Sequence, residues 1–518
     1  MQRLCYGEKL LSQTSADYLI RKGSVITGIT LLSRPLGFVR EAVQAYLFGA
    51  TFLVDAFVIS FNFPEMIQTL FFAGATSAFL IPVCSRYLED REEFSRIYSL
   101  FMNVAMIITV LVSIALLAAS GPVMHLIAPG FRSEGRYIAR YLFIIMIPII
   151  PLHALLSVMK AFLNAKEQFA APELSGIIWN IIFILAALTL GGTIGIYSLA
   201  LGVSLGAVAQ VLLQIPYLRR LGIRYQMRLP LDHPSLKEAK RLFTGAVVAT
   251  SVVPINSFIG RSIASYLPEG GVASLAYAFR IFLFPYSLFA VPIYTVLFSK
   301  LSRLFHEEDW KEIDSHIDGS LVLVCITLIP STIFLCVTGD VLVKLLYQRG
   351  AFAAKDTLMT YRALSGYGIG LIFSALSISF TRIFNARHDT RTPALIGLTS
   401  IGLNAVLVYV LMRPLGNFGV ALATSIISFY NFSVLYLLYR KRTLYRPSRK
   451  TKKEMAQSLI AGGIVALALI CLRHVFPGRP YLFFLLGSTI TVAIYALFFG
   501  SYYKAFLRGR QNKAHSSG

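Results

Sequence analysis

Long uninterrupted stretches of apolar residues recur along this chain, and short polar segments separate them. Residues 100–120, 242–259 and 393–412 contain no charged side chain. A helix needs about 20 apolar residues to cross the hydrocarbon core of a bilayer. A helix on a soluble protein would instead carry polar residues along one face. The pattern therefore predicts an all-α membrane protein that crosses the bilayer many times.

The apolar stretches predict about fourteen transmembrane helices. Their expected positions are residues 22–48, 53–84, 97–120, 138–163, 170–192, 194–218, 240–267, 271–301, 318–339, 358–386, 392–413, 416–439, 455–474 and 479–505. Basic residues concentrate in alternate connections, above all in 219–241 and 440–453. Because basic loops stay on the cytoplasmic side, we expect both termini in the cytoplasm.

Composition supports this interpretation. Hydrophobic residues make up 56% of the chain, charged residues only 14%, and the mean hydropathy is +0.67. The net charge of +23 follows largely from the cytoplasmic loops, so we expect no nucleic-acid partner. The five cysteines are scattered and form no paired motif, which predicts neither a disulfide framework nor a metal site. We expect no cofactor.

The chain also repeats itself. The segment FLNAKEQFAAP at 162–172 aligns with IFNARHDTRTP at 383–393, an offset of 221 residues. The same offset pairs further positions: 195–204 with 416–425, Arg40 with Arg261, and Gly49 with Gly270. A repeat of six helices places both copies in the membrane in the same orientation, as in transporters with parallel repeats. We therefore expect two six-helix lobes that flank a central cavity, and two extra C-terminal helices.

The repeat predicts a division of the chain into six parts. They are a cytoplasmic lead-in (1–21), an N-lobe with helices 1 to 6 (22–218), a basic cytoplasmic linker (219–239), a C-lobe with helices 7 to 12 (240–441), helices 13 and 14 (442–505) and a cytoplasmic tail (506–518).

Arginines inside the first span call for an explanation. Arg34 is expected near the middle of this helix and Arg40 about two turns further on. An arginine at the bilayer centre costs about 2.5–3.5 kcal/mol on insertion scales unless it faces water, a carboxylate or an anionic ligand. Either these residues face an anionic substrate, or they form internal ion pairs with an acid such as Glu41 or Asp55.

Neighbouring residues in the same segment favour a bend. Pro35 removes a backbone donor and Gly37 loosens the helix, so a hinge at these two positions is expected. A hinge here would present the guanidinium groups of the first helix to the cavity.

Further polar residues are expected in other spans. Arg280 lies in helix 8, and Arg261 in helix 7 is the duplicate of Arg40; Gln68 lies in helix 2. Guanidinium groups bind phosphate bidentately with charge assistance, so several of them in one cavity predict a di-anionic group such as a pyrophosphate. Motifs of nucleotide hydrolysis or of a metal-dependent transferase are missing from the sequence. The interpretation is a transporter and not an enzyme.

Five segments carry a family resemblance: SRPLGFVRE, VDAFVISFNFP, AYAFRIFLFP, YQRGAFAAKDT and FNARHDTRTP. With them the chain resembles the MurJ (MviN) lipid II flippases of the multidrug/oligosaccharidyl-lipid/polysaccharide exporter superfamily. The resemblance implies alternating access that moves lipid II, the undecaprenyl-pyrophosphate-linked peptidoglycan precursor, to the outer leaflet of the bacterial cytoplasmic membrane. It also implies a monomer in contact with membrane lipids, with helices 13 and 14 forming a groove for the lipid tail.

The resemblance assigns substrate-binding positions residue by residue. The positions that match the family's pattern are Ser33, Arg34, Arg40, Asp55 and Arg280. Glu41 replaces the usual aspartate, and Gln68 stands where the family has an arginine on helix 2, a loss for which Arg261 could compensate.

Some members of the family bind sodium through carboxylates in the C-lobe. Here the corresponding candidates are Asn256, Asn404 and Thr424, none of them acidic. A hard cation prefers charged oxygen ligands, so no conventional sodium site is expected and the coupling ion stays open. Two alternatives also remain: an exporter of another polyprenyl-linked glycan or amphipathic substrate and, less favoured, a membrane-embedded polyprenyl-phosphate transferase.

Overall fold

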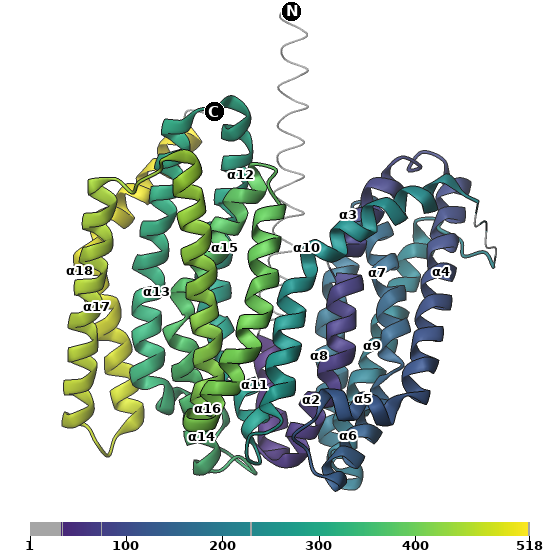
Figure 1. The fold of residues 1–518 in the computed structure, drawn as a ribbon, viewed down its shortest axis with the longest axis horizontal. Coiled ribbons are helices and arrows are strands. Elements are labelled where there is room, and N and C mark those ends of the chain that lie inside the picture. Colours follow the sequence, from purple (N-terminus) through teal and green to yellow (C-terminus); the bar gives the residue numbers. More distant parts are fainter. Residues whose placement is uncertain (1–32, 34, 74, 228–229, 231, 516–518) are drawn as a thin grey trace, which may run out of the picture. The chain divides into compact units, whose positions relative to one another are not determined.

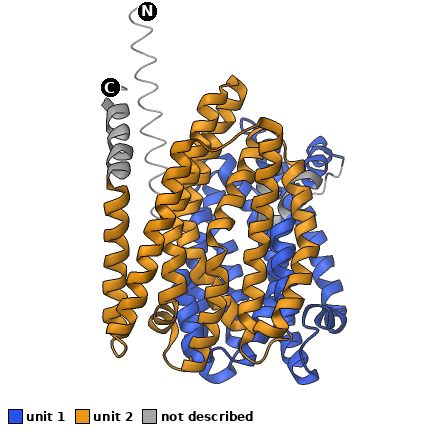
Figure 2. Ribbon diagram, turned by 60° about the vertical axis from the view of Figure 1, so that its left-hand side comes forward, with its two compact units in different colours: residues 1–265 blue, residues 266–518 orange. Residues whose placement is uncertain are grey.

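The computed structural model describes residue 33 and residues 35–515 apart from 74, 228, 229 and 231. Within this part of the chain every regular element is a helix (Figure 1). The predicted all-α class is therefore confirmed. The chain divides into two compact units, residues 1–265 and residues 266–518 (Figure 2).

Unit 1 begins with a helix over residues 35–48. Its further elements are α2 (Phe52–Gln68), the π-helix η1 (Thr69–Ala73), α3 (Ala75–Ser85), α4 (Arg91–Ala118), α5 (Ser120–Ile127), α6 (Ser133–Met146), α7 (Ile149–Ala165), α8 (Ala170–Ile194), α9 (Tyr197–Arg220) and α10 (Pro234–Ala264). The helix expected at 53–84 is thus interrupted by a π-turn that follows Pro64. Proline lacks the backbone donor that a continuous helix needs, and a π-turn replaces the regular helical hydrogen bonds by bonds between residues i and i+5.

Unit 2 consists of α11 (Gly271–Pro285), the π-helix η2 (Tyr286–Ala290), α12 (Val291–Glu307), α13 (Trp310–Tyr347), α14 (Ala354–Ile369), α15 (Leu371–Ala386), α16 (Arg391–Thr443), α17 (Arg449–Val475) and α18 (Pro480–His515). The two spans expected at 392–413 and 416–439 both lie within α16, where the non-helical backbone of Gly416 marks a kink between two helical parts. The span expected at 318–339 is much longer, because polar turns that start at the N-cap Asp309 continue the helix beyond its apolar stretch.

The described residues contain nine helices that are long and apolar enough to cross a membrane, or ten if the bent pair α14 and α15 counts as one span. The chain is therefore a multi-pass membrane protein. The expected number of fourteen is not confirmed: α16 alone covers two expected spans, α2 and α3 are each too short, and most of the first span lies outside the described residues.

The backbone confirms the internal repeat. Positive φ angles recur at the offset of 221 residues in three pairs: Gly49 with Gly270, Glu167 with His388, and Gly195 with Gly416. The angles of the last pair nearly coincide, at φ 60°, ψ −136° for Gly195 and φ 55°, ψ −132° for Gly416. Positive φ angles are uncommon outside specific turns. Their agreement at three pairs of positions indicates that the two copies of the repeat share one backbone structure.

One interhelical hydrogen bond is duplicated at the same offset. The Ser204 hydroxyl donates to the carbonyl oxygen of Ile145 over 2.8 Å, and the Ser425 hydroxyl donates to that of Gly366 over 2.6 Å. Both residues of the second bond lie 221 positions after their counterparts. A side-chain bond between membrane helices stabilises their packing, and here the two units use the same one.

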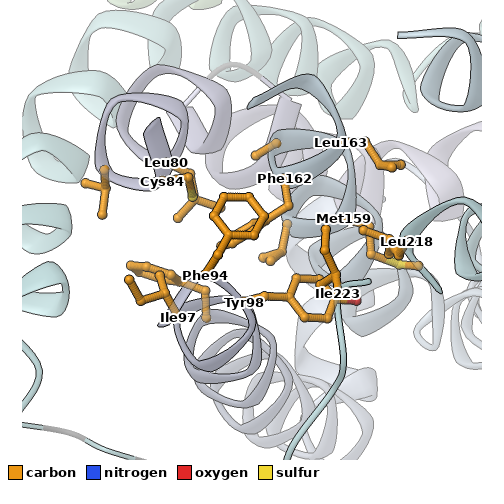
Figure 3. Close-up of a cluster of buried hydrophobic side chains, with 14 of the residues drawn as sticks. Leu80, Cys84, Phe94, Ile97, Tyr98, Met159, Phe162, Leu163, Leu218 and Ile223 are labelled. Carbon is orange, nitrogen blue, oxygen red and sulfur yellow. The ribbon is translucent and has the colours of Figure 1, made fainter. Parts of the chain in front are cut away.

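The core of unit 1 lies where α3, α4, α7 and α9 meet (Figure 3). Its centre is Phe162, whose ring packs edge-on against Phe94 and Tyr98 with centroids 4.9 and 5.2 Å apart. Lys166 lies over Phe94 at 4.7 Å and donates to the carbonyl oxygen of Leu88. This core fixes the end of the bundle where the connection from α7 to α8 begins.

The two helices expected outside the repeat pack on one long helix. Buried residues of α13 such as Cys325 and Ile329 contact Ala461 and Val465 of α17, and Tyr495 of α18 joins the same cluster. The expected groove for a lipid tail along these helices is not tested by this packing and stays a prediction.

Helix α10 packs against α2, η1 and α3 and belongs to unit 1. Residues 240–264 of α10 were expected as the first helix of the C-lobe at 240–441. The boundary between the compact units, after Ser265, therefore lies further along the chain than the boundary that the repeat predicts. The expected lobe boundaries stay a prediction about the functional halves. The packing of α10 has one direct consequence: it brings Arg261 against α2.

Candidate functional site

Arg40 lies in the helix over residues 35–48 and is held on two sides. Its Nη2 lies 2.6 Å from Oε1 of Glu41, and both side chains are only 11% exposed. Its guanidinium also stacks over the rings of Trp179 and Phe183 in α8, at 4.7 and 5.4 Å from their centroids. A carboxylate and two aromatic faces offset the cost of burying this cation. Of the two explanations that the sequence left open for Arg40, the structure contains the ion pair.

Arg261, the duplicate of Arg40, is held differently. Its Nη1 donates to Oδ1 of Asn62 over 3.0 Å and to Oε2 of Glu65 over 2.9 Å. The two acceptors are three residues apart on α2 and share one face. The Arg261 side chain is 26% exposed and that of Glu65 is 41% exposed. The side chains of the Arg261–Glu65 ion pair are therefore partly exposed, whereas those of the Arg40–Glu41 pair are mostly buried.

The repeat explains the difference. The residue after Arg40 is an acid, but the residue after Arg261 is Ser262. Arg261 has no acid beside it on its own helix and is paired through α2 instead. The sequence did not predict the contact between Arg261 and Glu65, since 196 residues separate them.

The other expected substrate-binding residues of unit 1 are described by their position and burial alone. Ser33 is helical and half-buried, and Gln68 is half-buried as the last residue of α2. Asp55 is 2% exposed in the first turn of α2, which places it about 15 Å along the helix from Glu65. Arg34 lies outside the described residues. Of the expected hinge, Pro35 is exposed, and a side chain at Gly37 would contact nothing within 4 Å.

Unit 2 holds all but one of the remaining expected residues. Arg280 is half-buried in α11. Of the weak sodium candidates, Asn404 is buried and Thr424 is half-buried, on either side of the kink of α16, whereas Asn256 is half-buried in α10 of unit 1. The convergence of Arg280 with Arg40 and Arg261 stays a prediction, and so does the expected absence of a sodium site.

Several arginines within the expected spans were not singled out in the sequence, and Arg382 is one of them. Arg382 of α15 lies over the rings of Tyr294 and Phe298 of α12, 5.6 and 5.7 Å from their centroids. It is four residues from the end of α15, where a long side chain can reach the interface. Its position directly before the repeated segment IFNARHDTRTP at 383–393 was the available signal.

Comparison with known proteins covers almost the whole chain. A sequence profile of the family described as "Lipid II flippase MurJ" matches residues 44–489. The "Probable lipid II flippase MurJ" of Rickettsia prowazekii is 28% identical over 495 residues, which are 94% of this chain and 97% of that protein. The "Lipid II flippase MurJ" of Burkholderia cenocepacia is 29% identical over 462 residues, 87% of this chain and 89% of its own.

Solved structures give the same picture. "Lipid II flippase MurJ, inward closed conformation" superposes with a TM-score of 0.80 at 25% identity, over 93% of this chain and 99% of that one. An inward-facing multidrug resistance MATE family transporter of the MOP superfamily reaches a TM-score of 0.68 at 15% identity, over 83% and 98%. The second likeness shows the fold alone.

Proposed function

Because this chain belongs to the lipid II flippase MurJ family, a family of transporters and not of enzymes, we propose that it carries lipid II from the inner to the outer leaflet of the bacterial cytoplasmic membrane. The proposal includes a cationic cavity that binds the pyrophosphate headgroup, a cycle of alternating access, and both termini in the cytoplasm. The match over residues 44–489 supports the substrate, and the partly exposed Arg261–Glu65 pair supports the binding chemistry.

The Arg261–Glu65 pair suits reversible capture of an anion. Among the described residues, one carboxylate and one amide hold the guanidinium of Arg261, and the side chains of Arg261 and Glu65 are both partly exposed. A pyrophosphate offers more oxygen acceptors and more negative charge than one carboxylate, and guanidinium binds phosphate bidentately. The headgroup therefore displaces Glu65 from Arg261. When the headgroup leaves, Glu65 returns and lowers the cost of the unoccupied cation.

Arg40 has another part in the proposal. Its guanidinium is enclosed by Glu41, Trp179 and Phe183, and a ligand would have to break a buried ion pair to reach it. Breaking such a pair costs several kcal/mol, about 3–5. In this arrangement Arg40 fixes the first helix on α8, and it binds the headgroup only in a conformation where Glu41 has moved.

The transport cycle follows from differential binding. The headgroup enters from the cytoplasmic side and binds the cavity arginines, and the first helix bends near Pro35 and Gly37 as the lobes change conformation. A ligand shifts a conformational equilibrium only if it binds the states unequally. We place this difference in affinity at Arg261, which binds the headgroup strongly only in the state where Glu65 is released. The polyprenyl chain stays in lipid along α17 and α18.

Variants of the pair test whether Arg261 binds substrate or only stabilises the fold. We expect Arg261→Gln to reduce lipid II transport by about ten-fold or more, since a charge-assisted hydrogen bond contributes about 1.5–3 kcal/mol. We expect Glu65→Gln to keep transport and to bind lipid II more tightly. The measurement is leaflet-resolved lipid II in cells that depend on the variant, with binding measured on the purified protein.

The double variant Arg261→Gln/Glu65→Gln separates the two explanations. It leaves no unpaired charge, so a purely structural pair predicts that transport recovers, whereas a substrate-binding Arg261 predicts that it stays low. Recovery would overturn the role of Arg261. The exposed pair Arg303–Glu307 of α12 is the matched control: Arg303→Gln should leave transport unchanged.

A further inference from the structure

A cavity of about 450 Å³ lies in unit 2, where the connection from α10 to α11 meets the kink of α16. Its lining comes from Tyr266, Leu267, Pro268, Tyr409, Met412, Arg413 and Gly416. The volume falls in the range of small-ligand sites, about 300–1,000 Å³. The pattern of basic loops predicts that this end of the unit is extracytoplasmic.

The cavity contains a cation that no acid in the described part of the chain neutralises. The Arg413 guanidinium lies 4.4 Å from the ring centroid of Tyr409 and donates to the hydroxyl of the same residue. Among the described residues no carboxylate lies within ion-pair distance of Arg413, and Glu269 in the nearby connection is not part of the lining. An arginine on this side also departs from the positive-inside rule, so topology does not account for it.

The phenol groups complete a site for an anion. The Tyr409 hydroxyl accepts a hydrogen bond from Arg413 and keeps its own proton for another acceptor, so the two groups can bind a phosphate oxygen together. Tyr266 brings a second phenol to the lining. The kink keeps these groups together, because Gly416 has φ 55°, a conformation that favours glycine.

An apolar face leads away from the cavity along α16. Val406 and Val410 are 59% and 54% exposed, and they lie seven and three residues before Arg413 on the same side of the helix. Leu395 and Leu398, 63% and 51% exposed, extend the apolar surface toward the other end. A charged cavity at the end of such a face matches a molecule that has an anionic head and a hydrocarbon chain.

We propose that this cavity binds the phosphate-bearing headgroup of a membrane lipid, with Arg413 as its charge partner, Tyr409 and Tyr266 as hydroxyl donors, and the lipid chain along Val406 and Val410. The phosphate comes either from an anionic phospholipid of the bilayer or from a polyprenyl pyrophosphate. The proposal does not rest on the proposed function, because a lipid can occupy the cavity without being transported.

Lipid binding to the purified full-length protein tests the proposal, measured by native mass spectrometry in detergent. The probes are phosphatidylglycerol, undecaprenyl pyrophosphate, and diacylglycerol, which has chains but no phosphate. We expect Arg413→Gln to weaken binding of at least one phosphate lipid by about ten-fold and to leave diacylglycerol unchanged. Arg413→Lys should keep most of the affinity because it keeps the charge, and Tyr409→Phe should lose part of it.

The control is Arg440→Gln, which removes an exposed arginine from the last turn of α16 and should change nothing. Loss of phosphatidylglycerol binding alone identifies a bilayer lipid, and loss of undecaprenyl pyrophosphate binding alone identifies a polyprenyl lipid. Unchanged binding of both lipids in Arg413→Gln, or an equal loss of diacylglycerol, would overturn the proposal. A chain that binds lipid here and fails to move lipid II would contradict only the proposed function.

Discussion

Arg40 and Arg261, two arginines of expected spans, form ion pairs of different kinds. Glu41 is adjacent to Arg40 in the sequence, so an ion pair between them was one of the stated expectations, and it forms at 2.6 Å. The partner of Arg261 could not be predicted, because Glu65 reaches it only through the packing of α10 on α2. The sequence therefore identified both arginines, but the partner of Arg261 depends on helix packing that no local sequence pattern predicts.

A carboxylate outside the membrane gives a prediction on pH. Asp389, in the turn before α16, accepts hydrogen bonds from the Thr392 backbone, from the Thr392 hydroxyl and from Arg442, over 3.0, 2.6 and 2.6 Å. Burial raises the pKa of Asp389, but the hydrogen bonds from Thr392 and Arg442 outweigh it and hold the pKa below its usual range. A group whose pKa is lowered on folding stabilises the fold above its unfolded pKa, and this contribution is lost as the pH falls through the folded pKa.

We therefore expect Asp389→Asn to lower the melting temperature by a constant amount above about pH 5, and the difference to shrink as the pH falls below about 4. Thermal unfolding of the purified protein at a series of pH values measures it. Glu307→Gln, which removes an exposed carboxylate at the end of α12, is the control. A difference that does not depend on pH would contradict the role of the Asp389 charge.

At the scale of elements, apolar length predicted where the spans lie but not how far the helices extend beyond their apolar stretches. α4 and α8 lie close to the expected 97–120 and 170–192. The short α5, expected as part of a connection, has only eight residues, too few for an apolar pattern to stand out. α13 exceeds its apolar stretch because its polar turns continue the helix, and hydrophobicity does not report them.

Close contact between α14 and α16 gives a prediction on packing. A Cβ at Gly366 would lie 2.7 Å from the Ala421 Cβ and 2.8 Å from the carbonyl oxygen of Phe418. We expect Gly366→Ala to lower the melting temperature, since overpacking costs about 1–3 kcal/mol. Fluorescence-detected unfolding in detergent measures the change.

Gly402 of α16 is the matched control, because a Cβ there would contact nothing within 4 Å. Gly402→Ala removes glycine from a helix interior, which is worth about 0.5–1 kcal/mol in soluble helices, so its melting temperature should stay or rise. Equal melting temperatures for the two variants would show that the α14–α16 contact adjusts without cost.

At the scale of the whole molecule, the duplication was predictable and the compact units were not. The offset of 221 residues was visible in the aligned segments, and the paired angles at Gly195 and Gly416 confirm it. The place of α10 was not visible, because the repeat assigns α10 to the second copy while its contacts assign it to unit 1.

Orientation in the membrane gives a prediction for the complete chain. In a background without cysteine, we expect Ser133→Cys, at the start of α6, to react with a membrane-impermeant maleimide in spheroplasts. Lys450→Cys, at the basic start of α17, should react only after permeabilisation, because basic segments stay in the cytoplasm. Both positions are exposed, so each reacts whenever the reagent reaches it. The opposite labelling would reverse the expected orientation.

The central claim is that this chain moves lipid II across the membrane. Depletion of the protein in its native bacterium, followed by a leaflet-resolved assay of lipid II, tests the claim most directly. We expect lipid II to accumulate in the inner leaflet and to reappear in the outer leaflet when the unaltered chain is expressed again, but not when Arg261→Gln is expressed. Normal delivery of lipid II to the outer leaflet after depletion, in a strain without a second flippase, would contradict the account.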